Sequence, residues 1–333
     1  MQSIGVIGAG AWGTALAVAA RRAGRDVVLW ARNPDLAERL TTLRENADYL
    51  PGVALDPAIR ASGELETAAR CEALLLVVPA QHMRWIGTEL APLVPQGPDG
   101  PPLVICAKGI EQGSGALMGE VLEEVLPGRR VAVLSGPTFA AEVGRGLPSA
   151  VTLAAEDAAL AKSLVAALGS ATFRPYSSRD LLGAQLGGAL KNIIAIACGI
   201  VTGRALGDNA RAALITRGLA EIMRLGVAMG ARRETLMGLS GLGDLTLTCT
   251  GTLSRNYTLG RALGEGQSLD EIMRGRRSVA EGVFSASAAV RLAARHGVEM
   301  PIAQAVDEIL NRAAVIDEVI QGLLARPFTT ETA

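Results

Sequence analysis

The sequence carries almost no net charge. Its 333 residues include 32 Lys and Arg against 33 Asp and Glu, which leaves a formal net charge of −1. A chain without a strong basic field has no general attraction for nucleic acid or for an anionic lipid surface. An anionic partner must therefore be held by a local cluster of side chains, and we expect that partner to be a small molecule.

Cysteine and histidine are also scarce. The four cysteines lie far apart, without a Cys-x-x-Cys pair, and only two histidines are available to join them as metal ligands. We therefore expect neither a zinc site nor a disulfide framework. The six residues concerned are Cys71, His82, Cys106, Cys198, Cys249 and His296.

Long apolar segments are missing too. The longest apolar run, Ile193 to Val201, is well short of the roughly 20 residues needed to cross a bilayer. The chain passes from Met1 almost directly into a strand-like run, Ile4 to Ile7, without the basic region and apolar stretch of a signal peptide. We expect a soluble cytoplasmic protein without a membrane span.

Two patterns of apolar residues divide the chain. Up to about Tyr176, short β-branched runs alternate with amphipathic segments, which is typical of a mostly parallel sheet with crossover helices. From about Ser178 onward, only long Ala-, Leu- and Ile-rich helical patterns occur. The expected strands are Ser3–Ile7, Asp26–Ala31, Ala73–Val78, Leu103–Ala107, Val131–Ser135, Ser149–Ala154 and Ala171–Tyr176, and the expected helices are Asp180–Thr202, Asp208–Met229, Gly282–His296 and Ala303–Leu324.

These patterns predict an α/β fold class in two parts. A Rossmann-like, doubly wound domain is expected over residues 1–178, and an all-α domain is expected over residues 179–333. No long flexible linker separates them, so we expect the domains to pack tightly with the functional site between them.

A glycine-rich loop follows the first expected strand and opens a helical pattern. Gly8 permits the turn, Gly10 lets the backbone approach a pyrophosphate, and Gly13 lets the helix pack closely on the strand. The free N–H groups at the start of the helix suit an anion. This context predicts a dinucleotide site, although a tight turn without a ligand is the structural alternative.

The second expected strand ends at Arg32. An acidic residue at this position of a dinucleotide fold accepts from the ribose 2′-hydroxyl, whereas a guanidinium favours a 2′-phosphate. We therefore expect NADP or NAD as the cofactor, with NADPH favoured. Asn33 weakens the preference, because it has the sequence context of a helix N-cap followed by Pro34.

Lys191 stands in the middle of an apolar helical pattern. Gly187 and Gly188 precede it by four and three residues, on the same helix face, where they clear space for a ligand or a neighbouring backbone. The alternative is close helix packing with Lys191 extending to the surface.

The run from Gly241 to Asn256 concentrates hydroxyl groups, one carboxylate and one guanidinium. Its glycines are expected to let the backbone turn sharply around Asp244. Ser254, Arg255 and Asn256 offer a hydroxyl, a planar cation and an amide, a set that suits a phosphate. The alternative is an ordinary junction in which Ser254 caps a helix from about Tyr257.

Five motifs lie in order along the chain: Gly8-Ala-Gly-Ala-Trp-Gly13, Gly136-Pro-Thr-Phe-Ala140, Lys191-Asn192, the run from Gly241 to Asn256, and Val279-Ala-Glu-Gly282. Together they resemble the motifs of the bacterial-type NAD(P)-dependent glycerol-3-phosphate dehydrogenase family. The resemblance implies reversible reduction of dihydroxyacetone phosphate to sn-glycerol 3-phosphate, which supplies glycerophospholipid synthesis. Whether the chain forms a homodimer stays open.

The resemblance also implies site residues. The implied catalytic residues are Lys191 and Asp244. The implied substrate-binding residues are Lys108, Gly136, Thr138, Lys191, Asp244, Ser254, Arg255 and Asn256, with Thr138 standing where the family commonly has Ser. The implied cofactor-binding residues are Gly8, Gly10, Ala11, Trp12, Gly13, Arg32, Asn33, Tyr49, Lys108, Ala140, Arg255, Val279 and Glu281, of which Tyr49, Ala140 and Val279 carry no signal of their own.

A hydride transfer to a ketone needs an acid that protonates the developing alkoxide, and the reverse reaction needs a base. A partly buried lysine near a second cation can serve as both, because burial and like charge bring its pKa towards neutrality. Lys191 is the candidate, with Lys108 as the second cation and Asp244 orienting it. His82 follows an expected strand end and ranks below Lys191, because the family mechanism does not use it.

Two other functions remain open at this stage. A reductase of another small phosphorylated or acidic keto compound would share the two-domain plan. A dinucleotide sensor that binds without reacting is the alternative outside enzymes, and it leaves Lys191, Asp244 and Arg255 unexplained.

Overall fold

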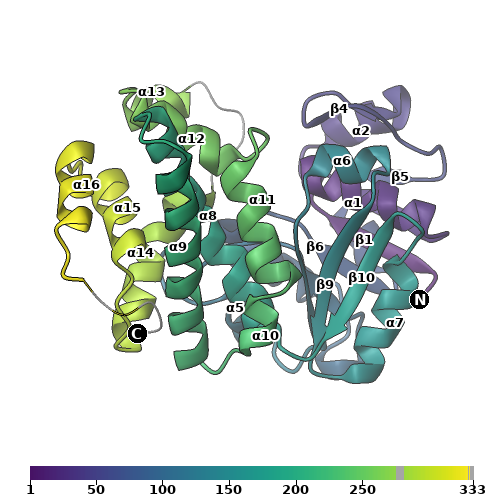
Figure 1. Ribbon diagram of the computed structural model, residues 1–333. Coiled ribbons are helices and arrows are strands. Elements are labelled where there is room, and N and C mark those ends of the chain that lie inside the picture. The colour runs from purple at the N-terminus through teal and green to yellow at the C-terminus, as the bar shows by residue number, and fades with distance from the viewer. Residues whose placement is uncertain (275–280, 329, 331–333) are drawn as a thin grey trace.

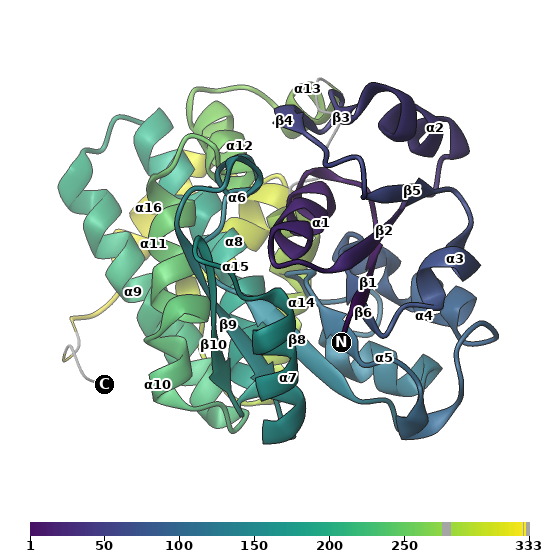
Figure 2. The same ribbon diagram turned by 90° about the vertical axis from the view of Figure 1, so that its right-hand side faces the viewer.

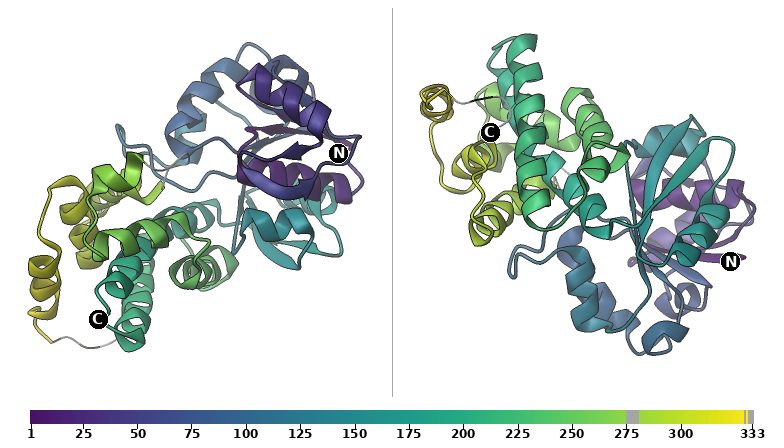
Figure 3. Two further views of the ribbon diagram at one scale, coloured as in Figure 1. Left: turned by 90° about the horizontal axis from the view of Figure 1, so that it is seen from above. Right: turned by 60° about the horizontal axis from the view of Figure 1, so that its bottom comes forward.

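The structure, a computed structural model, describes residues 1–274, 281–328 and 330. Its N-terminal half contains the sheet and its C-terminal half is helical, and the two halves lie side by side (Figure 1). Views from two further directions keep the same separation, with the last helix at the edge farthest from the sheet (Figure 3).

One eight-stranded sheet organises the N-terminal half. Neighbouring strands run parallel except for β8 and β9, which are antiparallel, so the sheet is mostly parallel as expected. The spatial order is β10-β9-β8-β7-β6-β1-β2-β5. The bounds are β1 Ser3–Ile7, β2 Asp26–Trp30, β5 Arg60–Ser62, β6 Ala73–Leu76, β7 Leu103–Ile105, β8 Val131–Ser135, β9 Ser149–Ala155 and β10 Phe173–Ser178.

Helices cover both faces of this sheet. Successive side chains of a strand point to opposite faces, so Ile4 and Val6 of β1 pack in one apolar cluster while Ile7 packs in the other. The helices are α1 Ala11–Arg22, α2 Pro34–Leu43, α3 Leu65–Ala69, α4 Met83–Leu90, α5 Met118–Val125, α6 Ala140–Arg145 and α7 Ala158–Leu168, with short 3₁₀ turns η1 Ala80–His82 and η2 Gly97–Asp99.

A small hairpin was not expected from the sequence. It pairs β3, Glu45–Asn46, with β4, Leu50–Ala54, and it lies above α1 in Figure 2. Neither strand has a β-branched run, and β3 is only two residues long. The short strand β5 was missed for the same reason.

One long helix, α8 Leu181–Gly203, forms the centre of the C-terminal half. It is apolar and long enough to cross a membrane by composition, yet 89% of its most apolar window is buried inside the protein. It is therefore a core helix. Around it lie α9 Asp208–Ala228, α10 Arg233–Leu236, the π-helical turn η3 Leu239–Gly243, α11 Asp244–Thr250, α12 Arg255–Gly264, α13 Leu269–Arg274, α14 Glu281–Arg295, α15 Pro301–Asn311 and α16 Ile316–Leu324.

The prediction of a single helix over Ala303–Leu324 is wrong. The structure has two helices there, because the chain reverses at Ala313, whose φ of 53° lies in the left-handed region. The sequence signals no such break, since Ala313 stands where Gly usually ends a helix.

Candidate active site

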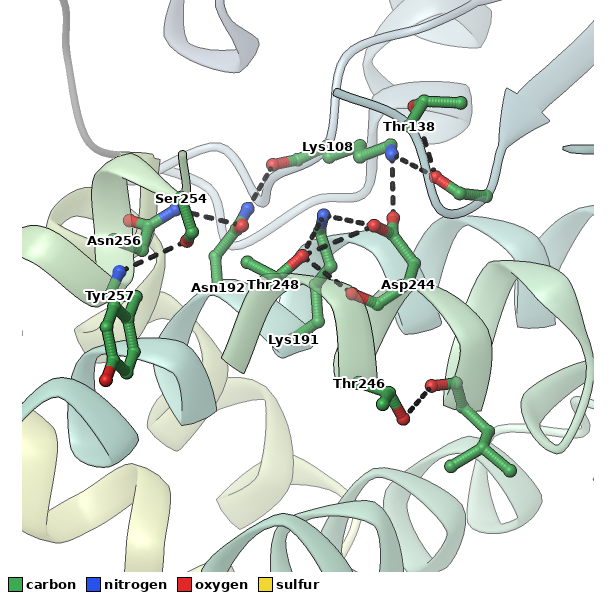
Figure 4. A network of polar contacts seen from close by, with 12 residues as sticks. Lys108, Thr138, Lys191, Asn192, Asp244, Thr246, Thr248, Ser254, Asn256 and Tyr257 are labelled. Carbon is green, nitrogen blue, oxygen red and sulfur yellow. Dashed lines mark hydrogen bonds and ion pairs between the residues drawn. The ribbon is translucent and has the colours of Figure 1, made fainter. Parts of the chain in front are cut away.

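Lys191 lies inside the protein rather than at its surface. Its side chain comes from the middle of α8 and is 8% exposed. The Nζ atom donates to Asp244 Oδ1 at 2.5 Å and to Thr248 Oγ1 at 2.8 Å (Figure 4). The alternative in which this lysine extends to solvent is therefore wrong.

Asp244 receives a second ammonium group from the other half of the chain. Lys108, just beyond β7, donates from Nζ to Asp244 Oδ2 at 2.7 Å and to the carbonyl oxygen of Gly136 at 2.9 Å. The Asp244 side chain is fully buried, and that of Lys108 is 16% exposed. One carboxylate thus holds two cations, one from each half of the fold.

This arrangement shifts the pKa of Lys191. Burial lowers the pKa by penalising the charged ammonium, the Asp244 carboxylate raises it, and the nearby Lys108 cation lowers it. The balance brings the pKa of Lys191 down to about 8. A lysine with such a pKa is present in both its charged and its neutral form near physiological pH.

Of the two expected uses of the glycines before Lys191, space for a ligand or for a neighbouring part of the chain, the structure shows the second. A Cβ on Gly187 would lie 2.4 Å from the carbonyl oxygen of Ser240, in the turn before Asp244. A Cβ on Gly188 would lie 2.8 Å from Ser135 Oγ and 3.2 Å from Cγ of Lys108. These two positions let η3 and the stem of Lys108 approach α8.

The prediction of a sharp turn around Asp244 is wrong. The chain instead passes through the π-helical turn η3 directly into α11, and Asp244 is the first residue of that helix. A Cβ on Gly241 would lie 1.9 Å from the carbonyl oxygen of Leu236, so this glycine permits close packing. Thr248, one helical turn after Asp244, donates to the carbonyl oxygen of Asp244 at 2.6 Å.

Ser254 and Asn256 already use their side chains within the protein. Ser254 Oγ accepts from the N–H of Tyr257 at 3.2 Å and caps α12. Asn256 Nδ2 donates to Asn192 Oδ1 at 2.9 Å, and its Oδ1 accepts from the N–H of Gly282 at 3.0 Å. Of the three residues expected to bind phosphate, only Arg255 is exposed.

The glycine-rich loop has the conformation that a dinucleotide needs. Gly8 has a φ of 119°, and a Cβ on Gly13 would lie 1.7 Å from the carbonyl oxygen of Gly8. Gly10 is the N-cap of α1, and a Cβ built there meets no atom within 4 Å, so the helix N-terminus faces open space. Two side chains expected at the cofactor also carry buried polar atoms without a partner among the described residues, Trp12 Nε1 and Glu281 Oε2. These features fit a bound NAD(P).

The other expected cofactor residues lie on several different elements. Arg32 is exposed just after β2, and Asn33 Oδ1 accepts from the N–H of Asp35, so Asn33 caps α2. Tyr49 is exposed in the β3–β4 turn and Ala140 begins α6. Ala11 begins α1, and Val279 lies outside the described residues.

Two polar residues at the centre had received no role. Thr248 contacts Lys191 directly, and Asn192 Nδ2 donates to the carbonyl oxygen of Lys108 at 3.2 Å. Residues four apart lie on the same face of a helix, so a helix predicted over this segment would have placed Thr248 next to Asp244. His82 is exposed at the end of the 3₁₀ turn η1. No group of His, Cys, Asp and Glu able to hold a metal ion is found among the described residues.

Comparisons with known proteins agree with this geometry. Residues 3–161 match the family described as NAD-dependent glycerol-3-phosphate dehydrogenase N-terminus, and residues 180–321 match its C-terminus. The glycerol-3-phosphate dehydrogenase (NAD(P)+) of Parvibaculum lavamentivorans is 59% identical over 331 residues, covering 99% of this chain and 98% of that protein. The chain belongs to the glycerol-3-phosphate dehydrogenase family.

Further relatives support the same assignment. The glycerol-3-phosphate dehydrogenase (NAD(P)+) of Rhodospirillum rubrum is 59% identical over 332 residues, covering 99% of this chain and 94% of that protein. The crystal structure of glycerol-3-phosphate dehydrogenase from Coxiella burnetii superposes with a TM-score of 0.93 at 38% identity, covering 98% of this chain and 99% of that one. The family, the Rossmann-like and all-helical fold and the NAD(P) cofactor expected from the sequence are confirmed.

Proposed function

We propose that this chain reduces dihydroxyacetone phosphate reversibly to sn-glycerol 3-phosphate with NADPH or NADH, and that it supplies glycerophospholipid synthesis in the cytoplasm. The observation that carries the proposal is the buried Lys108–Asp244–Lys191 cluster, in which one carboxylate joins a cation from each half. Two domains, residues 1–178 and 179–333, would then enclose the substrate between them.

Lys191 is the proton donor and acceptor. As an ammonium it protonates the oxygen of the substrate ketone, and as an amine it removes the proton from the product hydroxyl. Its pKa of about 8 leaves both forms available. When bound, the nicotinamide supplies the hydride for reduction.

Asp244 orients Lys191 and accepts a hydrogen bond from a substrate hydroxyl. Lys108 reaches the same carboxylate and contributes a positive charge at the substrate. Gly136 and Thr138 form the loop that Lys108 touches, with Thr138 Oγ1 donating to the carbonyl oxygen of Gly136 at 3.2 Å. Because Lys191 and Lys108 are both paired with Asp244, loss of this carboxylate would leave two cations without a counter-charge.

Arg255 is the phosphate anchor in this proposal. It begins α12 and is exposed, and its positive charge lies near Glu281 at the start of α14. A guanidinium binds phosphate in a bidentate manner. Ser254 and Asn256 support it through the cap and the inter-helix hydrogen bonds described above, while Gly8, Gly10 and Gly13 hold the cofactor.

The test is a comparison of initial rates. NADPH and NADH oxidation are followed with dihydroxyacetone phosphate beside unphosphorylated dihydroxyacetone. We expect turnover with the phosphate compound to exceed that with its analogue by a large factor. Equal rates would favour a different keto substrate, and tight NADPH binding without turnover would favour the sensor.

A further inference from the structure

Asn46 is a fully buried polar residue to which neither the sequence nor the proposed function gives a role. It lies in β3 of the hairpin above α1, and its side chain has an exposed fraction of zero. Its Nδ2 atom donates to the carbonyl oxygen of Ala9 at 2.9 Å and to Thr14 Oγ1 at 2.7 Å. The side-chain amide of Asn46 therefore holds both the glycine-rich loop, at Ala9, and the first turn of α1, at Thr14.

The contact with Ala9 has a direct geometric consequence. Ala9 stands between Gly8 and Gly10, and its carbonyl shares one planar trans peptide with the N–H of Gly10. In such a peptide the C=O and the N–H point in opposite directions. Fixing the carbonyl of Ala9 towards Asn46 therefore fixes the Gly10 N–H away from it, at the N-terminus of α1 where space is open.

The contact with Thr14 fixes the helix relative to the same hairpin. Thr14 is fully buried in α1, and its N–H donates to the carbonyl oxygen of Gly10 at 2.9 Å in the first helical turn. Holding both Ala9 and Thr14 leaves the segment between them little freedom. The free N–H groups that suit a pyrophosphate are then in place before the cofactor arrives, which reduces the entropy lost on binding.

The hairpin also connects this loop to other residues expected at the cofactor. The N–H of Tyr49 donates to the carbonyl oxygen of Asn46 at 3.2 Å. Leu50 and Val53 of β4 pack against Gly144 in α6, the helix that begins at Ala140. Asn46 is thus the polar link between the glycine-rich loop and a hairpin that reaches α6.

We propose that Asn46 is a positioning residue for NAD(P)H binding, acting through the carbonyl of Ala9 and the orientation of the Gly10 N–H. The inference rests on the proposed function in that the dinucleotide is the ligand. The remaining amide atom, Oδ1, is buried and has no partner among the described residues, so the donor atom Nδ2 carries the role.

The test measures the dissociation constant of NADPH by calorimetry, without substrate, well below the unfolding temperature. Asn46→Ala removes the donor and is expected to raise the Kd about 10-fold. Asn46→Asp keeps the shape but places a carboxylate against the carbonyl of Ala9 and adds a negative charge next to the glycine-rich loop, and it is expected to raise the Kd about 100-fold or more. The kcat at saturating NADPH is expected to stay within about 2-fold for Asn46→Ala, because no reacting group is moved.

Two controls separate positioning from stability. Leu164→Ala removes a fully buried side chain from the same apolar cluster without touching the loop, so it is expected to lower the Tm and leave the Kd unchanged. Thr14→Val removes one of the two acceptors and is expected to raise the Kd about 2- to 4-fold, whereas Thr14→Ser keeps the hydroxyl and the affinity.

The outcomes decide between three cases. Kd values of folded Asn46→Ala and Asn46→Asp within about 2-fold of the unchanged protein would overturn the proposal. If neither variant folds, Thr14→Val decides: a weakened Kd supports the proposal, and an unchanged Kd makes Asn46 a purely structural residue. Failure of the unchanged protein to bind NADPH would instead overturn the proposed function.

Discussion

Lys108 and Asp244 come from different halves of the chain and form a buried ion pair with 2.7 Å between Nζ and Oδ2. The other oxygen of the same carboxylate contacts Lys191 Nζ at 2.5 Å. Asp244 therefore has two effects: it ties the sheet-containing half to the helical half, and it raises the pKa of Lys191 against the effect of burial. A buried carboxylate with two cationic partners is costly to remove, because both cations lose their counter-charge.

Replacing this carboxylate should change the pH dependence as well as the rate. In Asp244→Asn the pKa of Lys191 is expected to fall below about 8, because the influence that raises it is gone. The rising limb of glycerol 3-phosphate oxidation should then shift to lower pH, together with a lower kcat/KM. The measurement is the pH profile of kcat/KM, with the exposed Asp208→Asn as control. An unmoved limb would show that Asp244 does not set this pKa.

Gly188 should be required for the placement of Lys108. An added Cβ would lie 2.8 Å from Ser135 Oγ and 3.2 Å from the stem of Lys108, so Gly188→Ala should displace that stem and its ammonium. We expect kcat/KM for dihydroxyacetone phosphate to fall by about 10-fold or more, comparable with the loss of one charged hydrogen bond. Gly322→Ala in α16 is the matched control, since a Cβ there meets no atom within 4 Å. Equal activities of the two variants would contradict the expectation.

Arg32 should discriminate between the two cofactors. It is exposed just after β2, where a guanidinium can contact a 2′-phosphate that NADH lacks. Arg32→Ala is expected to weaken NADPH binding by about 10- to 100-fold while changing NADH binding little. Dissociation constants for both cofactors test this, with Arg39→Ala on α2 as control. Equal losses for NADPH and NADH would mean that Arg32 does not read the 2′-phosphate.

Arg255 should act on substrate affinity. As the proposed phosphate anchor, its guanidinium would contact phosphate in the ground state and in the transition state alike, so Arg255→Ala is expected mainly to raise the KM for dihydroxyacetone phosphate. Some loss of NADPH affinity is also expected, since Arg255 is near Glu281. The measurement is the KM for dihydroxyacetone phosphate in steady-state kinetics, with Arg211→Ala as control. An unchanged KM in Arg255→Ala would mean that another residue binds the phosphate.

Most of the overall fold could be predicted from the sequence, because the patterns that mark its strands and helices are local. The seven expected strands and the long helices α8, α9 and α14 begin and end within two residues of their expected bounds. The β3–β4 hairpin was not predicted, because its two strands owe their pairing to tertiary contacts such as that of Asn46 with Ala9. The break at Ala313 was missed because a non-glycine residue adopts a left-handed conformation there.

The contrast between local sequence signals and contacts made only in the folded protein applies to the candidate active site as well. Lys191 stood out because a cation in an apolar helix is unusual, but its partners lie 53 and 57 residues further along the chain. Periodicity cannot predict such contacts. Ser254 and Asn256 show the opposite case, since residue types that suit a phosphate also suit a helix cap and a buried link between helices.

Lys191 itself provides the most decisive prediction. Lys191→Met keeps the length and the apolar stem but removes the charge and the transferable proton, so kcat should fall by about 10²- to 10⁴-fold in both directions. NADPH should still bind, because the glycine-rich loop is unchanged. Lys191→Arg should restore little, since a guanidinium stays protonated and cannot serve as base. Lys162→Met, an exposed lysine on α7, is the matched control.

The pH dependence of the unchanged protein gives an independent test of the same role. With a pKa lowered to about 8, Lys191 is mainly an ammonium below that pH and mainly an amine above it. Reduction needs the ammonium, so its rate should decline as the pH rises through about 8. Oxidation needs the amine, so its rate should rise over the same range. Hydride transfer in single-turnover experiments isolates this step from product release. A near-normal single-turnover rate in Lys191→Met would assign the proton to another group, with His82 or a water held by Asp244 as the next candidates.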